Sequence, residues 1–365
     1  MDDLARALAA AHPELKTVRE ATREPVYLVG GAVRDLLLGR PRADVDLVVE
    51  GDAAALAERL GGADVSHERF GTVKVDVAGH EVDVASARAE TYPEPGALPV
   101  VSPAEGIEQD LARRDFSVNA LAIPLQGEPR LIDPCGGKTD LDEGLLRVLH
   151  DRSFADDPTR AIRAARYASR FGFALEPKTE ELLRRTDLTT VSADRRRAEL
   201  ERLASEENAY RGFELLAEWG LIELRPDGLR LMRAVGELLG TPHWAEEVPR
   251  EQALVAAALG PPGGEEVLAS MWKPKPGEGV ELAERRDPVE LILARAMGAD
   301  WLDSYLTAWR KIQLDIDGDD LIAAGIEQGP AIGRGLRAAR HKKLEREIFG
   351  RDEELAAALA AALRD

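Results

Sequence analysis

The chain changes character near residue 140. Before this point, short apolar runs and alternating polar and apolar residues favour strands, whereas after it helical spacing dominates to the end of the sequence. The chain has 365 residues, which is more than one hydrophobic core usually supports. We therefore predict an α+β protein, with a small N-terminal sheet domain followed by an elongated, all-helical body and tail.

Three segments before residue 140 predict the strands of the sheet. VYLVGG, residues 26–31, is typical of a buried strand that ends in glycines, and the helix after it should stop at Gly39. DVDLVVE, residues 44–50, predicts a second strand. TVKVDVAGHEVDVASAR, residues 72–88, alternates on both sides of Ala-Gly-His and predicts a β-hairpin.

Two segments are predicted to lack regular structure. Residues 91–106 are rich in Pro, Gly, Ala and Val without periodicity, which predicts a long loop, and loops of this length are usually functional or disordered. GPPGGEE, residues 260–266, predicts a linker or a long turn within the helical part.

The charge of the chain does not settle what it binds. Acidic residues outnumber basic ones by 67 to 48, giving a formal net charge of −19, which on average disfavours phosphate contacts. Two stretches depart from this average: arginines recur at helical spacing within residues 160–170, and seven basic residues fall within residues 334–351. Each stretch is compatible with a binding surface or with a solvated, ion-paired helix face.

The composition narrows the class of protein further. Hydrophobic residues make up 44% of the sequence without any long apolar run, which is typical of a globular protein and not of a membrane protein. The first residues are acidic and do not resemble a secretory signal. Cys135 is the single cysteine in the sequence, so we expect no internal disulfide and a cytoplasmic location.

The strongest local feature is the pair of aspartates in Asp44-Val45-Asp46. Residues i and i+2 of a strand face the same side, so the two carboxylates are presented together. Such a pair can hold two divalent cations about 3.5 to 4 Å apart and support phosphoryl transfer. Acid-x-acid patterns arise often by chance in a chain with 67 acidic residues. Whether this pair indicates a metal site therefore depends on the neighbouring segments.

The neighbouring segments favour a phosphate and metal site. Gly30 and Gly31 end a strand and open a helix, which leaves backbone N–H groups free to face a phosphate, and Arg34 lies one turn further on. Glu81 and Asp83 point to one face of the second hairpin strand, where a carboxylate would complete an oxygen cage for a metal ion. The glycines alone are also compatible with a simple strand-to-helix turn.

Several motifs, in order, resemble those of the bacterial class II tRNA nucleotidyltransferase and poly(A) polymerase family, a branch of the polymerase β superfamily. The resemblance is close over residues 26–222. A segment near the end, DGDDLIAAGIEQGPAIGRGLRAAR, resembles the tail that many family members use for the RNA substrate. The motifs that carry the resemblance are VYLVGGAVRDLLLGRPRADVDLVV, EVDVASARAETY, LARRDFSVNALA, IDPCGGKTDL, FADDPTRAIRAARYASRFGF and VSADRRRAELERLASEENAYRGFELLAEWGL.

The resemblance implies roles for the residues of these motifs. Asp44 and Asp46, with Asp83 as the third carboxylate, would be the catalytic residues and would bind two Mg²⁺ ions, which suit an oxygen-only site. The ribose and triphosphate would be held by hydrogen-bond donors and their neighbours, namely Gly30, Gly31, Arg34, Arg113, Arg114, Asp115 and Asn119.

FADDPTRAIRAARY is similar to the segment with which family members read the incoming base without a template. Asp157, at the cap of a helix, and Arg160 would share one helical face and pair with the Watson–Crick edge of cytosine or adenine. Arg163 and Arg166 would continue that face toward the phosphates. Relatives commonly carry Glu where this chain has Asp156, which shortens the reach of this acid.

The activity implied is template-independent transfer of CMP, AMP or both from CTP and ATP to the 3′ end of tRNA. In the family, the loop at residues 91–103 matters for switching from C to A addition, and its full length here disfavours a purely CC-adding enzyme. A poly(A) polymerase and a non-catalytic RNA-binding relative are the alternatives. The sequence leaves open whether the enzyme adds CCA or only A, and it leaves the oligomeric state unknown.

The same resemblance implies that the chain is divided into three domains. Residues 1–140 would form the catalytic nucleotidyltransferase domain, residues 141–222 a helical neck that recognises the nucleotide, and residues 223–365 a helical body and tail. The tail would contact RNA through five basic residues: Arg334, Arg337, Arg340, Lys342 and Lys343.

Other conspicuous features predict structural roles. DIDGDD, residues 315–320, lacks the Gly and Glu that a calcium loop requires and predicts a helix cap instead. Trp301, Tyr305 and Trp309 recur at four-residue spacing, which favours the packed face of a helix over stacking on RNA bases. Cys135 is predicted to be a small buried residue.

Overall fold

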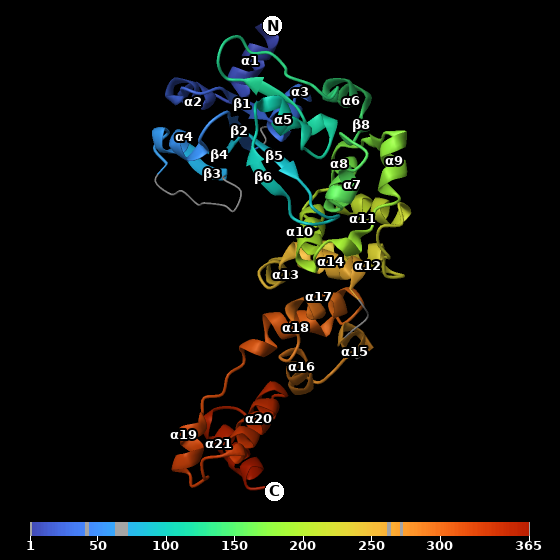
Figure 1. Cartoon of the computed structure of the whole chain (residues 1–365). Coiled ribbons are helices and arrows are strands. Elements are labelled where there is room, and N and C mark those ends of the chain that lie inside the picture. The colour runs from blue at the N-terminus through green and yellow to red at the C-terminus, as the bar shows by residue number, and fades with distance from the viewer. Residues whose placement is uncertain (1, 41–43, 63–71, 261–263, 271–272, 365) are drawn as a thin grey trace. The chain divides into compact units, whose positions relative to one another are not determined.

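The computed structural model describes residues 2–40, 44–62, 72–260, 264–270 and 273–364. The chain divides into two compact units, Met1–Ile222 and Glu223–Asp365 (Figure 1). The first unit contains the sheet and a set of helices that follows it, and the second unit is helical throughout its described residues. The predicted α+β class is therefore confirmed.

A five-stranded mixed sheet is the centre of the first unit. Its strand order is β3-β4-β2-β1-β7, with β2 and β4 parallel and the other neighbours antiparallel. All the strands predicted from the sequence are present, and β7 adds one edge. The bounds are β1 Val26–Val29, β2 Val45–Val49, β3 Thr72–Val77, β4 His80–Ser86 and β7 Ala122–Pro124.

Helices cover both faces of this sheet. Val45, Leu47 and Val49 of β2 point into a large core beneath α1, α2, α3 and α4, whereas Val48 points to a smaller core beneath α5. This alternation places Asp46 on the side of Val48, and the same period places Asp83 opposite Val82 and Val84. The helices are α1 Asp2–Ala11, α2 Leu15–Ala21, α3 Gly31–Leu37, α4 Ala53–Arg59, α5 Ile107–Ala112, the 3₁₀ helix Ser117–Asn119 and α6 Gly137–Glu143.

The long loop predicted for residues 91–106 is confirmed at residues 92–99 but wrong at Val100–Pro103, which form a strand. Strands β5, Arg88–Thr91, and β6, Val100–Pro103, form an antiparallel pair, and residues 92–99 connect them (Figure 1). All four residues of β6 are exposed, so burial imposes no alternation on its side chains. A sequence pattern based on burial therefore does not reveal this strand.

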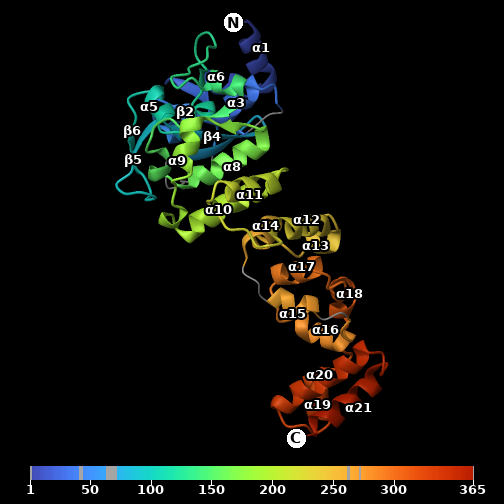
Figure 2. The ribbon, with the colours of Figure 1, turned by 90° about the vertical axis from the view of Figure 1, so that its right-hand side faces the viewer.

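Three of the remaining helices of the first unit, α7, α10 and α11, pack against α8. Its buried side carries Ala161, Ile162, Ala164, Ala165 and Ala168, and small residues let neighbouring helices approach closely. Helices α10 and α11 contact α8 directly (Figure 2). The elements are the short strands β8 Leu145–Leu146 and β9 Ala174–Leu175, α7 Ser153–Asp156, α8 Thr159–Phe171, α9 Pro177–Leu183, the 3₁₀ helix Leu188–Thr190, α10 Ala193–Ala204 and α11 Ala209–Glu218.

The second unit is built from helix pairs. Contacts join α12 to α14, α15 to α17, α16 to α18 and α20 to α21. In the described residues of the whole chain, no helix is both long and apolar enough to cross a membrane. The elements are α12 Gly228–Leu238, α13 Pro242–Ala245, α14 Arg250–Leu259, α15 Gly264–Ser270, α16 Pro276–Ala283, α17 Pro288–Ala296, α18 Trp301–Thr307, the 3₁₀ helix Trp309–Lys311, α19 Gly318–Ala323, α20 Pro330–Leu344 and α21 Arg351–Ala362.

The structural expectations for this region are confirmed only in part. Asp317 caps α19 in a capping box with Asp320, as predicted for DIDGDD. Trp301 and Tyr305 are buried on α18, whereas Trp309 lies beyond that helix and stacks on Trp301. The turn predicted at residues 260–266 falls partly outside the described residues, and α15 already begins at Gly264.

Candidate active site

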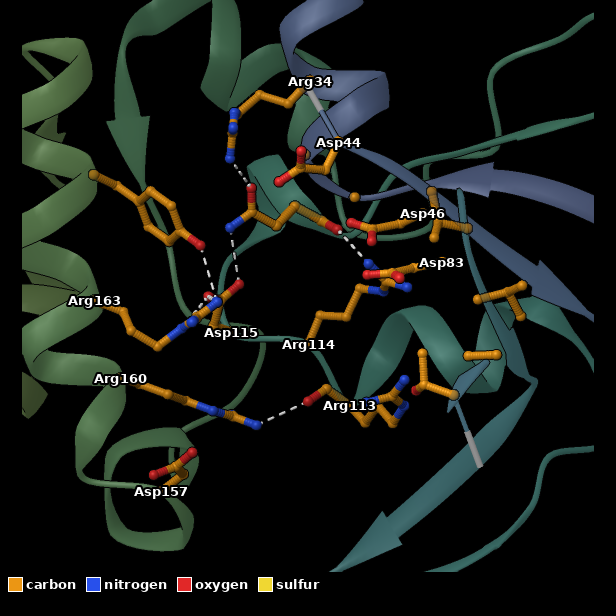
Figure 3. A pocket seen from close by; sticks show the side chains of 18 of the residues that line it. Arg34, Asp44, Asp46, Asp83, Arg113, Arg114, Asp115, Asp157, Arg160 and Arg163 are labelled. Carbon is orange, nitrogen blue, oxygen red and sulfur yellow. Dashed lines mark hydrogen bonds and ion pairs between the residues drawn. The ribbon is translucent and has the colours of Figure 1, made fainter. Parts of the chain in front are cut away.

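A cavity of about 670 Å³ in the first unit is lined by the residues that the motifs predict. It lies between the sheet face that carries Asp46 and the helix α8. Figure 3 shows Asp44, Asp46 and Asp83 on the sheet side and Asp157 with Arg160 on the helix side. The predicted residues that line it are Gly30, Gly31, Arg34, Asp44, Asp46, Asp83, Arg113, Arg114, Asp115, Asn119, Asp157, Arg160, Arg163 and Arg166.

Three carboxylates share the sheet side of the cavity. Asp46 and Asp83 are direct neighbours in the parallel pairing of β2 and β4, and Asp44 immediately precedes β2. Burial raises the pKa of Asp46 to about 6; Arg114 opposes this shift, and the nearby charges of Asp83 and Asp44 add to it. Burial likewise raises the pKa of Asp83, against the pull of Lys74.

These carboxylates suit a hard cation by their chemistry. All the donors are oxygens, and the buried Oδ1 of Asp83 accepts no hydrogen bond from the described residues. Crowded, partly buried carboxylates favour either proton uptake or a bound cation. In the described residues, however, no three His, Cys, Asp or Glu side chains are already arranged as a metal site. Asp83 Oδ1 instead lies 3.6 Å from Lys74 Nζ.

The turn at Gly30 brings an arginine close to the backbone. Gly30 has a φ of +66°, and a Cβ placed there would lie 2.6 Å from Arg114 Nη1. Arg34 uses its donors within the protein, because it binds Asn119 Oδ1 at 2.6 Å and Asp35 Oδ1 at 2.8 Å. Its guanidinium also lies 4.5 Å from the ring centre of Phe171. Arg34 therefore connects α3 with α8.

The arginines of the LARRDFSVNALA motif are oriented by two acids that the sequence analysis missed. Arg113 donates to Glu90 Oε1 at 2.8 Å and to Asp110 Oδ1 at 2.8 and 3.0 Å. Arg114 donates to Asp110 Oδ2 at 3.1 Å. Asp110, on α5, lies three residues before Arg113 and four before Arg114. This helical spacing is visible in the sequence. Glu90 arrives from β5, and no local pattern indicates it.

Both carboxylate oxygens of Asp115 accept hydrogen bonds from other residues of the protein. Its Oδ2 accepts hydrogen bonds from Nε and Nη2 of Arg163 at 2.8 and 2.6 Å, and its Oδ1 accepts from Asn119 Nδ2 at 2.9 Å and from the backbone N–H of Phe116 at 2.8 Å. Although burial raises the pKa of Asp115, Arg163 and Asn119 hold it well below its usual range. Its carboxylate thus orients two neighbours that face the cavity.

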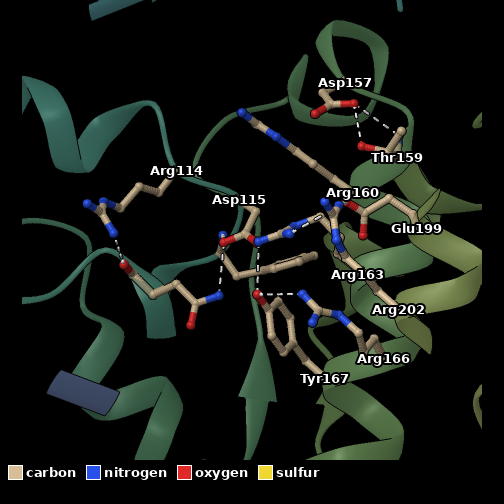
Figure 4. Close-up of polar contacts among 12 residues, drawn as sticks. Arg114, Asp115, Asp157, Thr159, Arg160, Arg163, Arg166, Tyr167, Glu199 and Arg202 are labelled. Carbon is tan, nitrogen blue, oxygen red and sulfur yellow. Dashed lines mark hydrogen bonds and ion pairs between the residues drawn. The ribbon is translucent and has the colours of Figure 1, made fainter. Parts of the chain in front are cut away.

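Aromatic and acidic side chains complete this network (Figure 4). The hydroxyl oxygen of Tyr167 accepts hydrogen bonds from Arg163 Nη2 at 2.9 Å and from Arg166 Nη2 at 3.4 Å. Burial raises the pKa of Tyr167. Glu206 of the α10–α11 connection lies 3.8 Å from Arg166 and accepts from Arg170 Nε at 2.6 Å. Sequence reasoning identified these arginines and missed their partners.

The segment around α8 holds Asp157 and Arg160 in fixed positions. Asp157 Oδ1 accepts from the backbone N–H of Thr159, the first residue of α8, at 3.1 Å, but the cap position that we predicted for Asp157 is occupied by Pro158. Arg160 is 4% exposed and donates to Ser153 Oγ at 2.6 Å and to the carbonyl oxygen of Arg113 at 2.8 Å. Asp156 does not line the cavity. Its Oδ1 instead accepts from Arg152 Nη2 at 3.1 Å.

The five basic residues of the tail have different surroundings. Arg340 pairs with Glu284 at 2.8 Å, and Lys343 pairs with Asp315 at 3.0 Å and with Glu354 at 2.5 Å. For these two residues the ion-paired alternative is the one observed. Arg334, Arg337 and Lys342 are exposed on α20. Arg334 also approaches the carbonyl oxygens of Ala362 and Arg364 at 3.5 Å. Cys135, predicted as buried, is only partly buried.

Comparisons with known proteins agree with this fold and site. Residues 26–147 match the poly A polymerase head domain, and residues 172–226 match the probable RNA and SrmB-binding site of polymerase A. A CC-adding tRNA nucleotidyltransferase of Deinococcus radiodurans is 36% identical over 349 residues, which cover 90% of this chain and 87% of that protein. A CCA-adding enzyme in an apo form has a TM-score of 0.80 at 29% identity, with 98% of each chain covered.

The chain combines this sheet topology with an arginine-lined cavity and a helical region that follows the sheet in sequence. This is the architecture of a poly(A) polymerase-type nucleotidyltransferase head. The chain belongs to the class II tRNA nucleotidyltransferase and poly(A) polymerase head family.

Other relatives match over a smaller share of their length. An A-adding tRNA nucleotidyltransferase of Halalkalibacterium halodurans is 41% identical over 247 residues, which cover 62% of this chain and 58% of that protein. The chain spans only 21% and 20% of the length of two further A-adding relatives, from Geobacter sulfurreducens and Aquifex aeolicus.

Proposed function

We propose that this protein transfers CMP, AMP or both from CTP and ATP to the 3′ end of tRNA and releases pyrophosphate. The observation that carries the proposal is a cavity that combines a carboxylate-bearing face of the sheet with Asp157, which precedes α8, and Arg160 on α8. Relatives named A-adding, CC-adding and CCA-adding enzymes support the substrate class. A structure of the Thermotoga maritima CCA-adding enzyme with tRNA, at a TM-score of 0.72 and 29% identity, supports it further.

We propose that Asp44, Asp46 and Asp83 hold two Mg²⁺ ions. Bound Mg²⁺ at such a site lowers the pKa of an attacking hydroxyl and neutralises charge on the phosphates. The protein itself contributes the orientation of the carboxylates. The pairing of β2 with β4 fixes Asp46 beside Asp83, and the short distance between their charges makes a cation favourable there.

The arginines around the cavity, together with Asp157, provide nucleotide binding in this proposal. The cavity volume of about 670 Å³ is in the range of small-molecule sites. Arg114 and Arg166 each have a buried Nε that makes no hydrogen bond with the described residues, and phosphate oxygens are suitable acceptors. Asp157 and Arg160 offer an acceptor and donors to the edge of the base. Because catalysis then rests on positioning and charge stabilisation, no histidine base is required.

The rest of the chain has proposed roles as well. We assign residues 1–140 to catalysis, residues 141–222 to nucleotide recognition and residues 223–365 to RNA binding. The exposed Arg334, Arg337 and Lys342 are the best placed of the tail residues to meet phosphates. The connection at residues 92–99 is present between β5 and β6, which favours A or CCA addition over CC addition alone.

One assay separates the activities. Purified protein is incubated with Mg²⁺, one labelled triphosphate at a time, and tRNA that ends before CCA, after CC, or after the complete CCA. A CCA-adding enzyme extends the first two tRNAs with C and A, and an A-adding enzyme extends only the second. A long A ladder on arbitrary RNA would identify a poly(A) polymerase instead, and no incorporation on any tRNA would identify a non-catalytic RNA-binding relative.

A further inference from the structure

Lys74 lies beside the carboxylates of the sheet side of the cavity, on the edge strand β3. In the pairing of β2, β4 and β3, Asp83 is aligned with Asp46 on one side and with Lys74 on the other. Figure 3 shows Asp46 and Asp83 next to each other. Since β3 is the outermost of these three strands and Lys74 does not line the cavity, Lys74 approaches Asp83 from the edge of the sheet.

The alternation of β3 explains why Lys74 faces this side of the sheet. The three valines of the strand are buried in the large core, so Thr72 and Lys74 point to the opposite face. Thr72 lines the cavity, which shows that this face is the one that carries the carboxylates. The side chain of Lys74 is 47% exposed, so it serves no purpose in the core.

The ammonium group of Lys74 is shared between two acids of β4. Its Nζ donates to Glu81 Oε1 at 2.5 Å and lies 3.6 Å from Asp83 Oδ1. The hydrogen bond to Glu81 and the charge of Asp83 raise the pKa of Lys74, so the ammonium stays charged at neutral pH. Asp83 Oδ1 is buried and accepts no hydrogen bond from the described residues. Lys74 therefore supplies positive charge to a carboxylate oxygen that lacks a hydrogen-bond donor.

A positive charge at this place opposes the binding of a second cation. Like charges a few ångströms apart repel, and the repulsion doubles when one of them is a divalent ion. The carboxylates of Asp46 and Asp83 attract a divalent cation, but part of the charge of Asp83 is already balanced by Lys74. A divalent cation that binds Asp83 must therefore overcome both the existing attraction and the new repulsion.

We propose that Lys74 sets the affinity of the metal site for divalent cations by competing with them for Asp83. This inference rests on the proposed function. Lys74 touches neither the nucleotide nor the metal ions in this account, so it is not a catalytic residue. Its ammonium acts through Asp83, and the Mg²⁺ requirement of the protein is thereby set in part by a residue outside the cavity.

The first test measures Mn²⁺ binding without nucleotide, by electron paramagnetic resonance of the free ion. Mn²⁺ is a suitable probe because it takes the same oxygen ligands as Mg²⁺. The variants K74M and K74Q both remove the charge, and K74M keeps the apolar stem of the lysine. Each should tighten Mn²⁺ binding by about fivefold at low ionic strength, and by less where salt screens the ammonium. K74R keeps the charge, so its affinity should be no higher than that of the unchanged protein.

Lys138→Met is the matched control. Lys138 is another lysine that pairs with an exposed acid, Asp142 on α6, and neither of these two residues lines the cavity. The dissociation constant for Mn²⁺ should stay at the level of the unchanged protein in this variant. Equal constants in K74M, K74Q and the unchanged protein, or an equal tightening in K138M, would overturn the inference.

The second test asks whether the effect passes through Asp83. When Asp83 is already replaced in Asp83→Asn, the further change K74M should alter the Mn²⁺ affinity by less than about twofold, since the two residues act on the metal as one unit. The same fivefold tightening in both backgrounds would contradict competition for Asp83, because it would show that Lys74 acts on the whole cavity by its charge alone.

Nucleotide addition separates this inference from the proposed function. In K74M, the Mg²⁺ concentration that gives half-maximal incorporation into tRNA should fall together with the Mn²⁺ dissociation constant. A protein that binds no Mn²⁺ and adds no nucleotide before any substitution would refute the proposed function. An unchanged protein that is active and binds Mn²⁺ as tightly as K74M would refute only the role of Lys74.

Discussion

Asp115 and Arg163 form a bidentate pair, with Nε and Nη2 of Arg163 donating to one carboxylate oxygen at 2.8 and 2.6 Å. The two residues lie 48 positions apart in the chain. Asp115 follows the arginine pair of the LARRDFSVNALA motif, and Arg163 belongs to α8. This contact fastens the wall of the cavity that carries the motif arginines to the helix that carries Arg160.

Removing the charge of Asp115 should destabilise the first unit. In Asp115→Asn, the guanidinium of Arg163 loses its negatively charged partner. Breaking a buried ion pair in this way lowers the free energy of unfolding by about 3 kcal/mol. Urea unfolding followed by circular dichroism measures the loss. Asp142→Asn is the control, because Asp142 and Lys138 form an exposed pair on α6, and such pairs contribute less than about 1 kcal/mol. Equal losses in both variants would contradict the role given to Asp115.

The same pair predicts how stability depends on pH. The pKa of Asp115 is held below its usual range in the folded protein, so its stabilising contribution is complete above the unfolded value of about 3.9 and is lost as the pH falls below it. The difference in urea midpoint between the unchanged protein and Asp115→Asn should therefore be constant near neutral pH and shrink below about pH 4. A difference in urea midpoint that grows on acidification would show that the predicted direction of the pH dependence is wrong.

Local spacing explains why much of the site could be predicted. Asp44, Asp46 and Asp83 follow from the two-residue period of strands, whereas Asp157 and the arginines of the cavity follow from the resemblance to the family motifs. The strand β6 could not be predicted because its side chains are all exposed and carry no burial pattern.

The partners of the predicted residues are harder to see in the sequence. Glu90, Arg195 and Glu206 reach their arginine or aspartate partners only through tertiary packing, at separations of 23, 38 and 36 residues. The motif predicts that Asp115 belongs to the site. Only the structure shows that its two oxygens are already occupied by other residues.

Replacing an aspartate on the sheet side of the cavity should abolish nucleotide addition without unfolding the protein. In Asp44→Ala or Asp46→Ala, the proposed metal site loses a ligand, and the loss of metal stabilisation should lower incorporation by at least about a thousandfold. Asp46→Ala should not reduce thermal stability, since burial already penalises its charge. Glu81→Gln is the control, because Glu81 lies on the same strand as Asp83 but outside the cavity. Near-normal turnover in either alanine variant would refute the assignment.

The turn at Gly30 should tolerate no side chain. In Gly30→Ala, the new Cβ would meet Arg114 Nη1 at 2.6 Å, and the positive φ of +66° adds backbone strain of about 1 kcal/mol. We expect weaker binding of the triphosphate as a rise in KM for CTP and ATP, because Arg114 must move. Gly39→Ala carries similar strain at a φ of +61° with no atom within 4 Å, so it should lower stability alone. Equal KM values in the two variants would argue against a role for Arg114 in binding nucleotide.

The tail offers a contrast between an exposed arginine and an ion-paired one. Arg337 is exposed on α20, whereas Arg340 on the same helix is paired with Glu284 at 2.8 Å and donates to the carbonyl oxygen of Ile312 at 3.3 Å. If Arg337 contacts a tRNA phosphate, Arg337→Ala should weaken tRNA binding and reduce the slope of log K against log salt by about 1. Arg340→Ala should lower the thermal stability of the second unit and leave the salt slope unchanged. Filter binding at several salt concentrations measures the slopes, and an unchanged slope in Arg337→Ala would remove this residue from the RNA surface.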